Sequence, residues 1–308
     1  MSGSWIADDI PDQHGRLAIV TGANSGLGAV TALELARHGA QVVVAARSVE
    51  RGEATAAEIA AAGGGPKLLV RKLDLGSLDS VRSFADEFSG ERVDLLVNNA
   101  GVMMTPYRTT SDGFELQLGT NHLGHFALTG LLLEAVERSD AGRVVTVSSN
   151  EHKGGHIDFD DLQQERTYSP RGAYQRSKLA NAIFAIELDR RLRSAVSPAI
   201  SVFAHPGYSA TNLQRTGPTG VMKAALVIGN RLLAQPAERG ALPTLYAATA
   251  PGVAGGDYYG PDGPWEMRGS PRPVTAIPEA YDAEIGPRLW QVSEQLTGVH
   301  YKLRGTVA

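Results

Sequence analysis

The sequence of 308 residues contains no cysteine. This absence excludes disulfide bonds, thiolate metal ligands and a cysteine nucleophile, and it is compatible with a reducing compartment. An excess of charge of either sign is also missing, because 29 basic residues stand against 33 acidic ones, for a formal net charge of -4. We therefore expect neither nucleic acid nor an anionic membrane surface as a partner.

Long hydrophobic runs are absent as well. The most apolar stretches, residues 126–136 and 222–234, are interrupted by polar side chains and are shorter than the ~20 residues that cross a bilayer. The N-terminus carries acidic residues and a proline where a secretion signal needs a basic start and an apolar run. These features predict a cytoplasmic protein with no membrane span.

What the sequence does contain is a regular alternation of short apolar runs and longer segments of helical period. The runs cover residues 17–20, 41–46, 67–73, 93–98, 143–149 and 200–204, and the helical segments lie near 27–38, 51–62, 78–88, 114–138 and 173–193. The runs are continuously apolar, as strands of a parallel sheet covered on both faces are. The pattern predicts an α/β fold, a single-domain doubly wound parallel sheet (Rossmann fold) with helices on both faces, spanning residues 1–308.

The rhythm changes after His205. Loops rich in glycine and proline surround helical segments near 219–234, 237–248 and 277–296. Because ligands of such folds bind at the carboxyl edge of the sheet, we expect residues 150–172 and 207–250 to form substrate-side loops and a lid. The apolar segment near 220–234 suits a hydrophobic substrate pocket, and it suits a buried or dimer-facing helix equally well.

The first predicted strand runs directly into TGANSGLG, residues 21–28, and then into a helix. Gly22, Gly26 and Gly28 permit a tight turn and a close approach of backbone to a pyrophosphate, and the following helix N-terminus favours an anion. A plain structural turn is the alternative. The strand before and the helix after favour dinucleotide binding, with Asn24, Ser25 and Leu27 between and beside the glycines.

The end of the second strand indicates which dinucleotide binds. An NAD site usually has an acidic residue there to accept from the ribose hydroxyls, but this strand ends with Ala46 followed by Arg47. A guanidinium offers several donors to a 2′-phosphate, which an acid would repel. The sequence favours NADP(H) over NAD(H), unless Arg47 only solvates the strand end.

Residues 174–178 read YQRSK, which puts Tyr174 and Lys178 on one face of a helix. An ammonium close to a phenol favours the phenolate and lowers the phenol pKa towards working pH. The pair could therefore exchange a proton with an alcohol or carbonyl oxygen, although such spacing is more often a solvated helix face. Ser148 and Ser149 end the fifth strand, and either hydroxyl could bind the same oxygen.

Together, the TGxxxGxG turn, NNAG at 98–101 and the YxxxK pair resemble the short-chain dehydrogenase/reductase family. The resemblance implies that Ser149 is the catalytic serine, that Tyr174 is the general acid/base, and that Lys178 tunes it and binds the cofactor ribose. It implies that Asn121 completes a catalytic tetrad by distorting its helix, so that a backbone carbonyl holds a water of the proton relay.

The resemblance also implies further cofactor contacts. Asp74 and Leu75 match the adenine position. Asn98 matches a residue that stabilises the sheet. Ala100 and Gly101 let the cofactor lie close. In HPGYSAT, Pro206 and Gly207 bring the backbone near the nicotinamide. Thr211 matches the residue that binds the carboxamide or a phosphate.

Further stretches, among them TNHLGHFALT, VVTVSSNEH and YYGPDGPWEMRG, resemble the retinol-dehydrogenase-like branch of that family. This implies an NADP(H)-dependent oxidoreductase that interconverts an alcohol and a carbonyl, with a small to medium apolar aldehyde or ketone as substrate. A catalytically idle NADPH-binding sensor or scaffold is the alternative. Relatives pair through the fourth and fifth helices, so a homodimer stays open. We expect no metal, since a solvated loop is the simpler reading of His152, His156 and the nearby aspartates.

Overall fold

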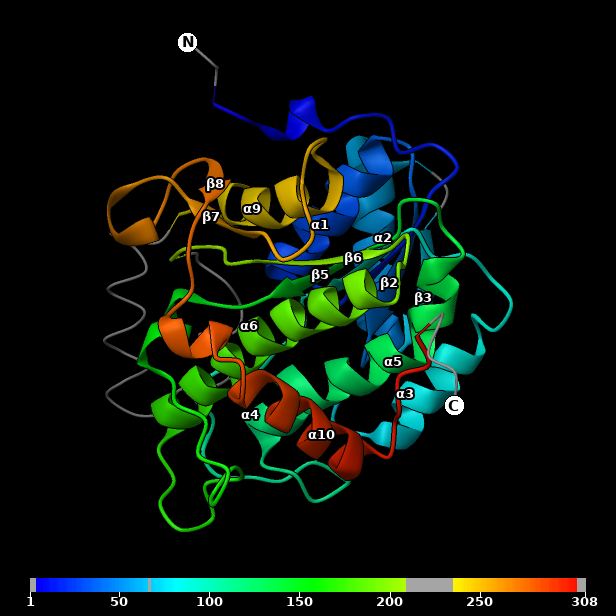
Figure 1. The fold of residues 1–308 in the computed structure, drawn as a ribbon. Coiled ribbons are helices and arrows are strands. Elements are labelled where there is room, and N and C mark those ends of the chain that lie inside the picture. Colours follow the sequence, from blue (N-terminus) through cyan, green and yellow to red (C-terminus); the bar gives the residue numbers. More distant parts are fainter. Residues whose placement is uncertain (1–3, 66–67, 209–234, 304–308) are drawn as a thin grey trace.

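Figure 1 presents the computed structural model of the chain, which describes residues 4–65, 68–208 and 235–303. One sheet crosses these residues with the strand order β3-β2-β1-β4-β5-β6-β7-β8. Its strands are β1 Leu17–Thr21, β2 Gln41–Ala46, β3 Leu68–Lys72, β4 Leu95–Asn98, β5 Arg143–Val147, β6 Ile200–Ala204, β7 Tyr258–Pro261 and β8 Pro271–Pro273. The predicted doubly wound parallel sheet is confirmed.

Within the sheet of the described residues, neighbouring strands from β3 to β7 are parallel, and β8 pairs antiparallel with β7. The chain proceeds outward from β1 to β3 and then returns to β4 on the other side of β1. This reversal is the switch point at which such sheets bind ligands. It sets the turn after β1 beside the loop after β4.

Helices cover both faces of the sheet (Figure 1). One layer contains α1 Gly26–Arg37, α2 Val49–Ile59 and α9 Ala237–Thr249, and the other contains α3 Leu78–Asp86, α5 Gly124–Glu137 and α6 Pro170–Ser194. Each layer shares a buried apolar cluster with its face of the sheet. These two clusters explain why the strands are apolar on both sides.

Shorter helical elements connect the large ones. They are η1 Ala7–Asp9, η2 Ala60–Gly64, α4 Leu116–Leu118, η3 Gly119–Leu123, η4 Asn150–Gly154, η5 Pro264–Glu266 and η6 Pro278–Tyr281. The single helix predicted over 114–138 is thus divided, because η3 is a π-helical turn between α4 and α5. Such turns frequently occur at functional sites.

Two parts of the sequence prediction need correction. Strands β7 and β8 were not predicted, because β7 ends in Gly-Pro and β8 reads Pro-Arg-Pro, so neither segment shows the apolar run of a typical strand. Residues 237–249, expected within the lid of 207–250, form α9, whose buried side chains pack on the sheet and α1 rather than over the carboxyl edge. The predicted helix near 219–234 lies outside the described residues.

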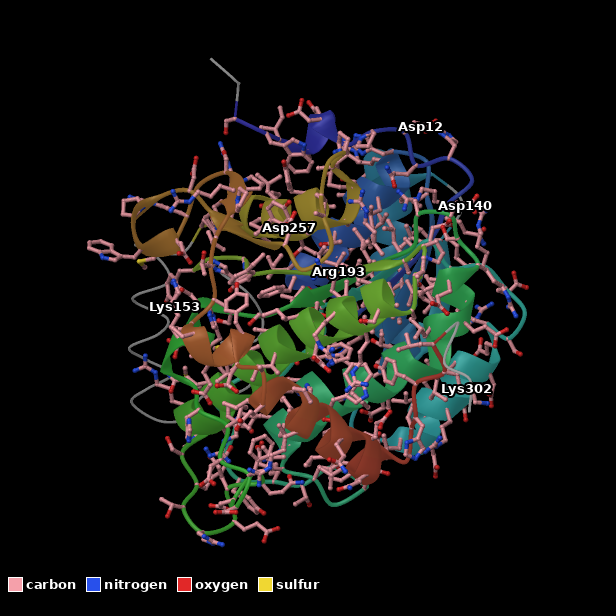
Figure 2. The ribbon with its side chains drawn as sticks, viewed as in Figure 1. Asp12, Asp140, Lys153, Arg193, Asp257 and Lys302 are labelled. Carbon is pink, nitrogen blue, oxygen red and sulfur yellow. The ribbon has the colours of Figure 1, made fainter. Side chains whose placement is uncertain are left out.

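The last helix, α10 Ile285–Thr297, lies over α5 and α6 on the outer side of their layer (Figure 1). It covers part of the face through which the two helices were expected to pair with a second copy, and the homodimer stays a prediction. Charged side chains such as Asp12, Asp140 and Lys302 lie at the periphery (Figure 2).

Candidate active site

The turn after β1 has the geometry that its glycine pattern predicts. Gly22 and Gly26 have φ angles of +66° and +56°, which residues with side chains rarely adopt. A Cβ atom on Gly22 would lie 2.9 Å from the Cα of Ala100, and one on Gly28 would lie 2.6 Å from the carbonyl oxygen of Gly22. The turn therefore packs backbone against backbone.

Helix α1 begins directly after this turn, at the switch point of the sheet. Its N-cap residue is Ser25, whose side chain makes no capping hydrogen bond, so the first N–H groups and the helix dipole favour an anion. Asn24 accepts a hydrogen bond from Thr55 through its carbonyl oxygen at 3.1 Å, and Leu27 packs on the cluster beside α1. The geometry fits the pyrophosphate of a dinucleotide.

Thr21 joins this turn to the loop after β4, a role that the sequence did not reveal. Its Oγ1 accepts hydrogen bonds from the backbone N–H groups of Asn99 and Ala100, both at 2.9 Å. Asn98, just before them, is fully buried and donates through Nδ2 to the hydroxyl of Thr129 at 2.9 Å. The only available signal was a polar residue at the end of an apolar strand.

The residues predicted around the adenosine lie at the ends of β2 and β3. Arg47 is exposed directly after β2, whereas Ala46 is buried. The Asp74 carboxylate accepts a hydrogen bond from the N–H of Gly76 at 2.9 Å. Leu75 is buried in the core cluster with α3 and α5, so its side chain contributes to packing.

Tyr174 lies near the start of α6 and is buried. Burial raises the pKa of its phenol to about 12, and a hydrogen bond with Ser149 opposes part of this rise. The net lowering of this pKa that was expected from Lys178 is wrong for this structure: burial raises the pKa, and the ammonium stands 5.9 Å from the ring centroid. The phenol is therefore protonated at neutral pH.

The two serines after β5 have different partners. Ser148 donates its hydroxyl hydrogen to the backbone carbonyl of Lys178 at 2.7 Å and so fixes α6 to the strand end. Ser149 caps η4, where its Oγ accepts from the N–H of Glu151 at 3.2 Å, and it is the serine beside the Tyr174 phenol.

Lys178 is buried one helical turn after Tyr174. Burial lowers the pKa of its ammonium to about 8, and Nζ donates to the carbonyl oxygen of Val147 at 2.9 Å. A Cβ atom placed on Gly101 would lie 3.7 Å from this Nζ and 3.1 Å from Oδ1 of Asn121. The predicted lysine, asparagine and NNAG glycine thus meet at one point.

Asn121 is fully buried in the π-helical turn η3. Its side chain makes two hydrogen bonds to the loop after β4. Oδ1 accepts from the N–H of Val102 at 2.8 Å, and Nδ2 donates to the carbonyl oxygen of Val102 at 2.9 Å. Nδ2 also donates to the hydroxyl of Ser177 on α6 at 2.9 Å. The helix distortion that the resemblance implies is present at this residue.

The profile of the short-chain dehydrogenase family matches residues 16–217. Human retinol dehydrogenase 13 is 44% identical over 294 residues, which cover 92% of this chain and 85% of that protein. Mouse polyprenol dehydrogenase is 43% identical and covers 97% of this chain and 88% of its own length. The chain belongs to the short-chain dehydrogenase family. It falls in the retinol-dehydrogenase-like branch.

Solved structures agree with this assignment. The crystal structure of an uncharacterized protein from Mycobacterium paratuberculosis is 46% identical, with a TM-score of 0.83 over 98% of this chain and all of that one. An NAD(P)-dependent gluconate 5-dehydrogenase from Beutenbergia cavernae, solved with bound NADP at low occupancy, is 25% identical over 80% of this chain and 95% of its own, with a TM-score of 0.64.

This short-chain dehydrogenase is an oxidoreductase that acts on CH–OH groups. Its family uses NAD(P), and the uncapped start of α1 at the switch point fits that group. In the loop after β6, Gly207 has a φ of +63°, and a Cβ atom on it would lie 2.4 Å from the carbonyl oxygen of Met267. Pro206 precedes it and accepts from Gln235 through its carbonyl at 2.8 Å. The predicted Thr211 lies outside the described residues.

The loop that contains η5, which the sequence did not indicate as part of the site, borders the carboxyl edge of the sheet. Trp265 and Glu266 have φ angles of +51° and +57°, a strained backbone of the kind that clusters at functional sites. Contacts with His205 at 3.1 Å and Lys153 at 2.9 Å lower the pKa of the Glu266 carboxyl to about 2. The Glu266 carboxylate thereby ties η5 to the loops after β5 and β6.

His152 and His156, the histidines weighed for a metal site, have separate partners. His152 is buried, and its Nδ1 contacts the carbonyl oxygen of Ser149 at 2.6 Å, whereas the exposed His156 contacts Glu279. The prediction that His152 lies in a solvated loop is therefore wrong. In the part of the chain that the structure describes, no three such side chains could hold a metal ion. Within the same ranges, no helix combines the length and apolarity needed to cross a membrane.

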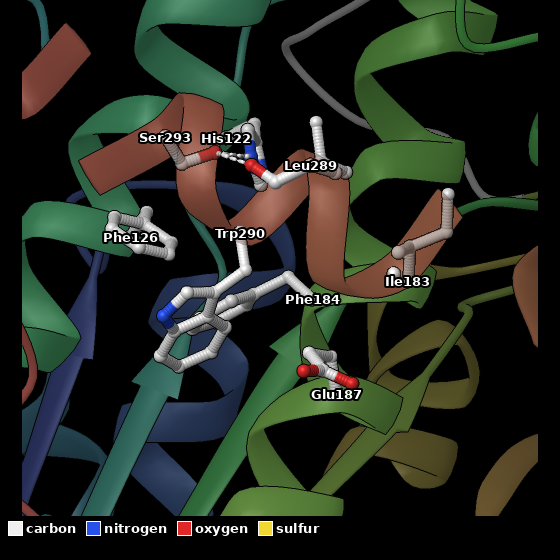
Figure 3. Close-up of a pocket in the computed structure, with 9 residues that line it drawn as sticks. His122, Phe126, Ile183, Phe184, Glu187, Leu289, Trp290 and Ser293 are labelled. Atoms are coloured by element: carbon white, nitrogen blue, oxygen red, sulfur yellow. Dashed lines mark hydrogen bonds between the residues drawn. The ribbon is translucent and has the colours of Figure 1, made fainter. Parts of the chain in front are cut away.

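The pocket in Figure 3 lies elsewhere, between α5, α6 and α10. Phe126, Phe184 and Trp290 line it together with His122, and none of the predicted site residues does. It is a packing seam under α10 rather than a substrate site, because it holds no room for a water molecule.

Proposed function

We propose that this short-chain dehydrogenase interconverts an apolar alcohol and its aldehyde or ketone, of small to medium size, with NADP(H) as the hydride carrier. The observation that carries the proposal is the convergence of Tyr174, Ser149, Lys178 and Asn121 beside Gly101 at the switch point. The names of the retinol and polyprenol dehydrogenases among its relatives support a lipophilic alcohol.

In this proposal Tyr174 gives its proton to the carbonyl oxygen during reduction and takes it back during oxidation. The pKa of about 12 keeps the phenol protonated at neutral pH, as reduction requires. Ser149 hydrogen-bonds the same substrate oxygen, and the Lys178 ammonium stabilises negative charge on the phenolate after transfer. NADP(H), when bound, supplies or accepts the hydride.

We assign the cofactor preference to Arg47. Its exposed guanidinium directly follows β2. The buried Ala46 is the last residue of that strand, the position at which an acidic residue would favour NAD. We further propose that the chain acts as one domain, with residues 150–172 on the substrate side of the sheet.

The test measures NADPH oxidation at 340 nm with a panel of apolar aldehydes and ketones. We expect turnover by the wild type and a loss of about 10²–10⁴-fold in kcat for Tyr174→Phe, while NADPH binding persists. Arg47→Ala should raise the KM for NADPH by roughly ten- to a hundredfold, because hydrogen bonds to a charged group are lost, and should leave the KM for NADH unchanged.

Three outcomes contradict all or part of the proposal. If the wild type binds NADPH and turns over no panel member, the idle sensor takes precedence. If Tyr174→Phe retains wild-type kcat, the phenol is not the proton donor. A wild-type preference for NADH, or a preference for NADPH that survives Arg47→Ala, overturns the cofactor assignment alone.

A further inference from the structure

His125 is a fully buried histidine on α5, one helical turn after Asn121. Its Nδ1 lies 2.9 Å from the backbone carbonyl oxygen of Asn121. Its Nε2 lies 2.9 Å from Oγ1 of Thr21. One imidazole ring therefore touches both the π-helical turn of the site and the hydroxyl at the end of β1.

The partners fix the tautomer of this ring. A carbonyl oxygen can only accept, so Nδ1 of His125 carries the hydrogen. Burial lowers the pKa of the ring to about 3, with Lys178 and His122 as the titratable groups that oppose its charge. The ring is neutral at pH 7, so Nε2 is an acceptor and Thr21 donates its hydroxyl hydrogen to it.

The hydrogen-bonding capacity of the Thr21 hydroxyl, one donor and two acceptor positions, is then filled. It accepts from the N–H groups of Asn99 and Ala100, and it donates to His125 in preference to the carbonyl oxygen of Val97, which is farther away at 3.3 Å. A continuous set of hydrogen bonds runs from the loop after β4 through Thr21 and His125 to Asn121.

We propose that His125 is a positioning residue that aims the Asn121 carbonyl and couples it to the cofactor turn after β1. This inference rests on the proposed function. The carbonyl oxygen of Asn121 has two lone pairs. In this proposal His125 occupies one and fixes the direction of the other, which the proton relay through Lys178 uses.

A buried histidine that only satisfies its own polar atoms would explain the same contacts, and His122 provides the matched control. It lies three residues earlier, is equally buried, and is neutral at pH 7 because burial lowers its pKa to about 4. Its Nε2 contacts the hydroxyl of Ser293 on α10 at 2.9 Å instead of the site.

Two substitutions separate the two contacts of His125. His125→Asn keeps an amide N–H near the position of Nδ1 and loses the Thr21 contact, so NADPH should bind about three- to tenfold more weakly with kcat little changed. His125→Gln reaches Thr21 and loses the Asn121 contact, so kcat should fall about tenfold or more, with a displaced pH profile. His122→Asn should leave the kinetics and NADPH binding of the folded enzyme as in the wild type.

A spectroscopic measurement decides the case where turnover is lacking or a variant fails to fold. Nitrogen-15 NMR of wild-type protein with labelled histidine, assigned through the His125 variants or by through-bond correlation, should give a neutral Nδ1–H ring that does not titrate between pH 5 and 8. A neutral Nε2–H ring, or one that titrates in this range, overturns the proposal. So does a His122→Asn variant that reproduces the changes of both His125 variants, or a pair of His125 variants with wild-type kcat, NADPH affinity and pH profile.

Discussion

Two regions of helices α5 and α6 differ sharply in their chemistry, the catalytic region around Tyr174 and Lys178 and the aromatic region around Phe126 and Phe184. At the start of α6, Tyr174 and Lys178 are buried polar groups whose pKa values are displaced by loss of hydration. Farther along, Phe184 packs against Phe126 and Trp290, at ring-centroid distances of 5.6 Å between the phenylalanines and 6.0 Å to the indole. The same pair of helices carries groups whose burial costs stability and groups whose burial provides it.

Further side chains pack against the aromatic region. Trp290 on α10 also contacts Tyr301 at 4.3 Å between ring centroids, and the Arg191 guanidinium lies 4.3 Å above the indole. Glu187 holds that guanidinium by an ion pair at 2.7 Å. The difference teaches that burial of the aromatic region offsets the cost of burying the polar groups of the catalytic region, so that each region can be disturbed separately.

The largest effect should come from Lys178→Met. We expect kcat/KM to fall about a thousandfold, because the phenolate loses its stabilising charge, yet unfolding should require about 1–3 kcal/mol more free energy. Burial lowers the pKa of Lys178 from 10.5 to about 8, so below that pH the folded state bears the cost of a buried charge that methionine removes.

Steady-state kinetics and urea unfolding at pH 7 check this prediction. The exposed Lys302 (Figure 2) provides the control, since Lys302→Met should change neither quantity. A Lys178→Met protein that is less stable than the wild type would contradict the contrast between the catalytic and aromatic regions.

Trp290→Ala should show the converse behaviour. Removing this indole, which is 4% exposed, should lower the free energy of unfolding by about 3–5 kcal/mol, with kcat of the folded fraction unchanged. The matched control is Trp265→Ala at an indole that is 83% exposed, where we expect a change within about 0.5 kcal/mol. Equal losses in both variants, measured by urea unfolding, would refute the assignment of stability to the α10 seam.

The smallest effect concerns pH. Burial lowers the pKa values of His122 and His152 from 6.5 to about 4, so between these values the unfolded chain binds protons that the folded chain does not. Stability should therefore fall as pH drops below 6.5. His122→Asn should lower the loss between pH 7 and 5 by about 1–2 kcal/mol, measured by unfolding at each pH, and an unchanged slope would contradict it.

Much of the fold could be predicted from the sequence, because its signals are local. Continuous apolar runs indicated strands β1 to β6 within a few residues, and TGANSGLG indicated the turn before α1. Strands β7 and β8 were not predicted because they depend on pairing with β6 and with each other, and no local sequence pattern encodes this pairing. The lid assignment failed at α9 for a related reason, since only packing decides which face a helix covers.

At the site, the sequence alone determined which chemical groups are present and how far apart they stand along the chain. Spacing sufficed for Tyr174 and Lys178, because one helix turn fixes their common face. Only the tertiary structure decided that the Tyr174 pKa rises, that Ser149 rather than Ser148 stands beside the phenol, and that His125 joins Asn121 to Thr21. Burial and hydrogen-bond partners set these properties, and both depend on segments that are distant in sequence and meet only in the folded chain.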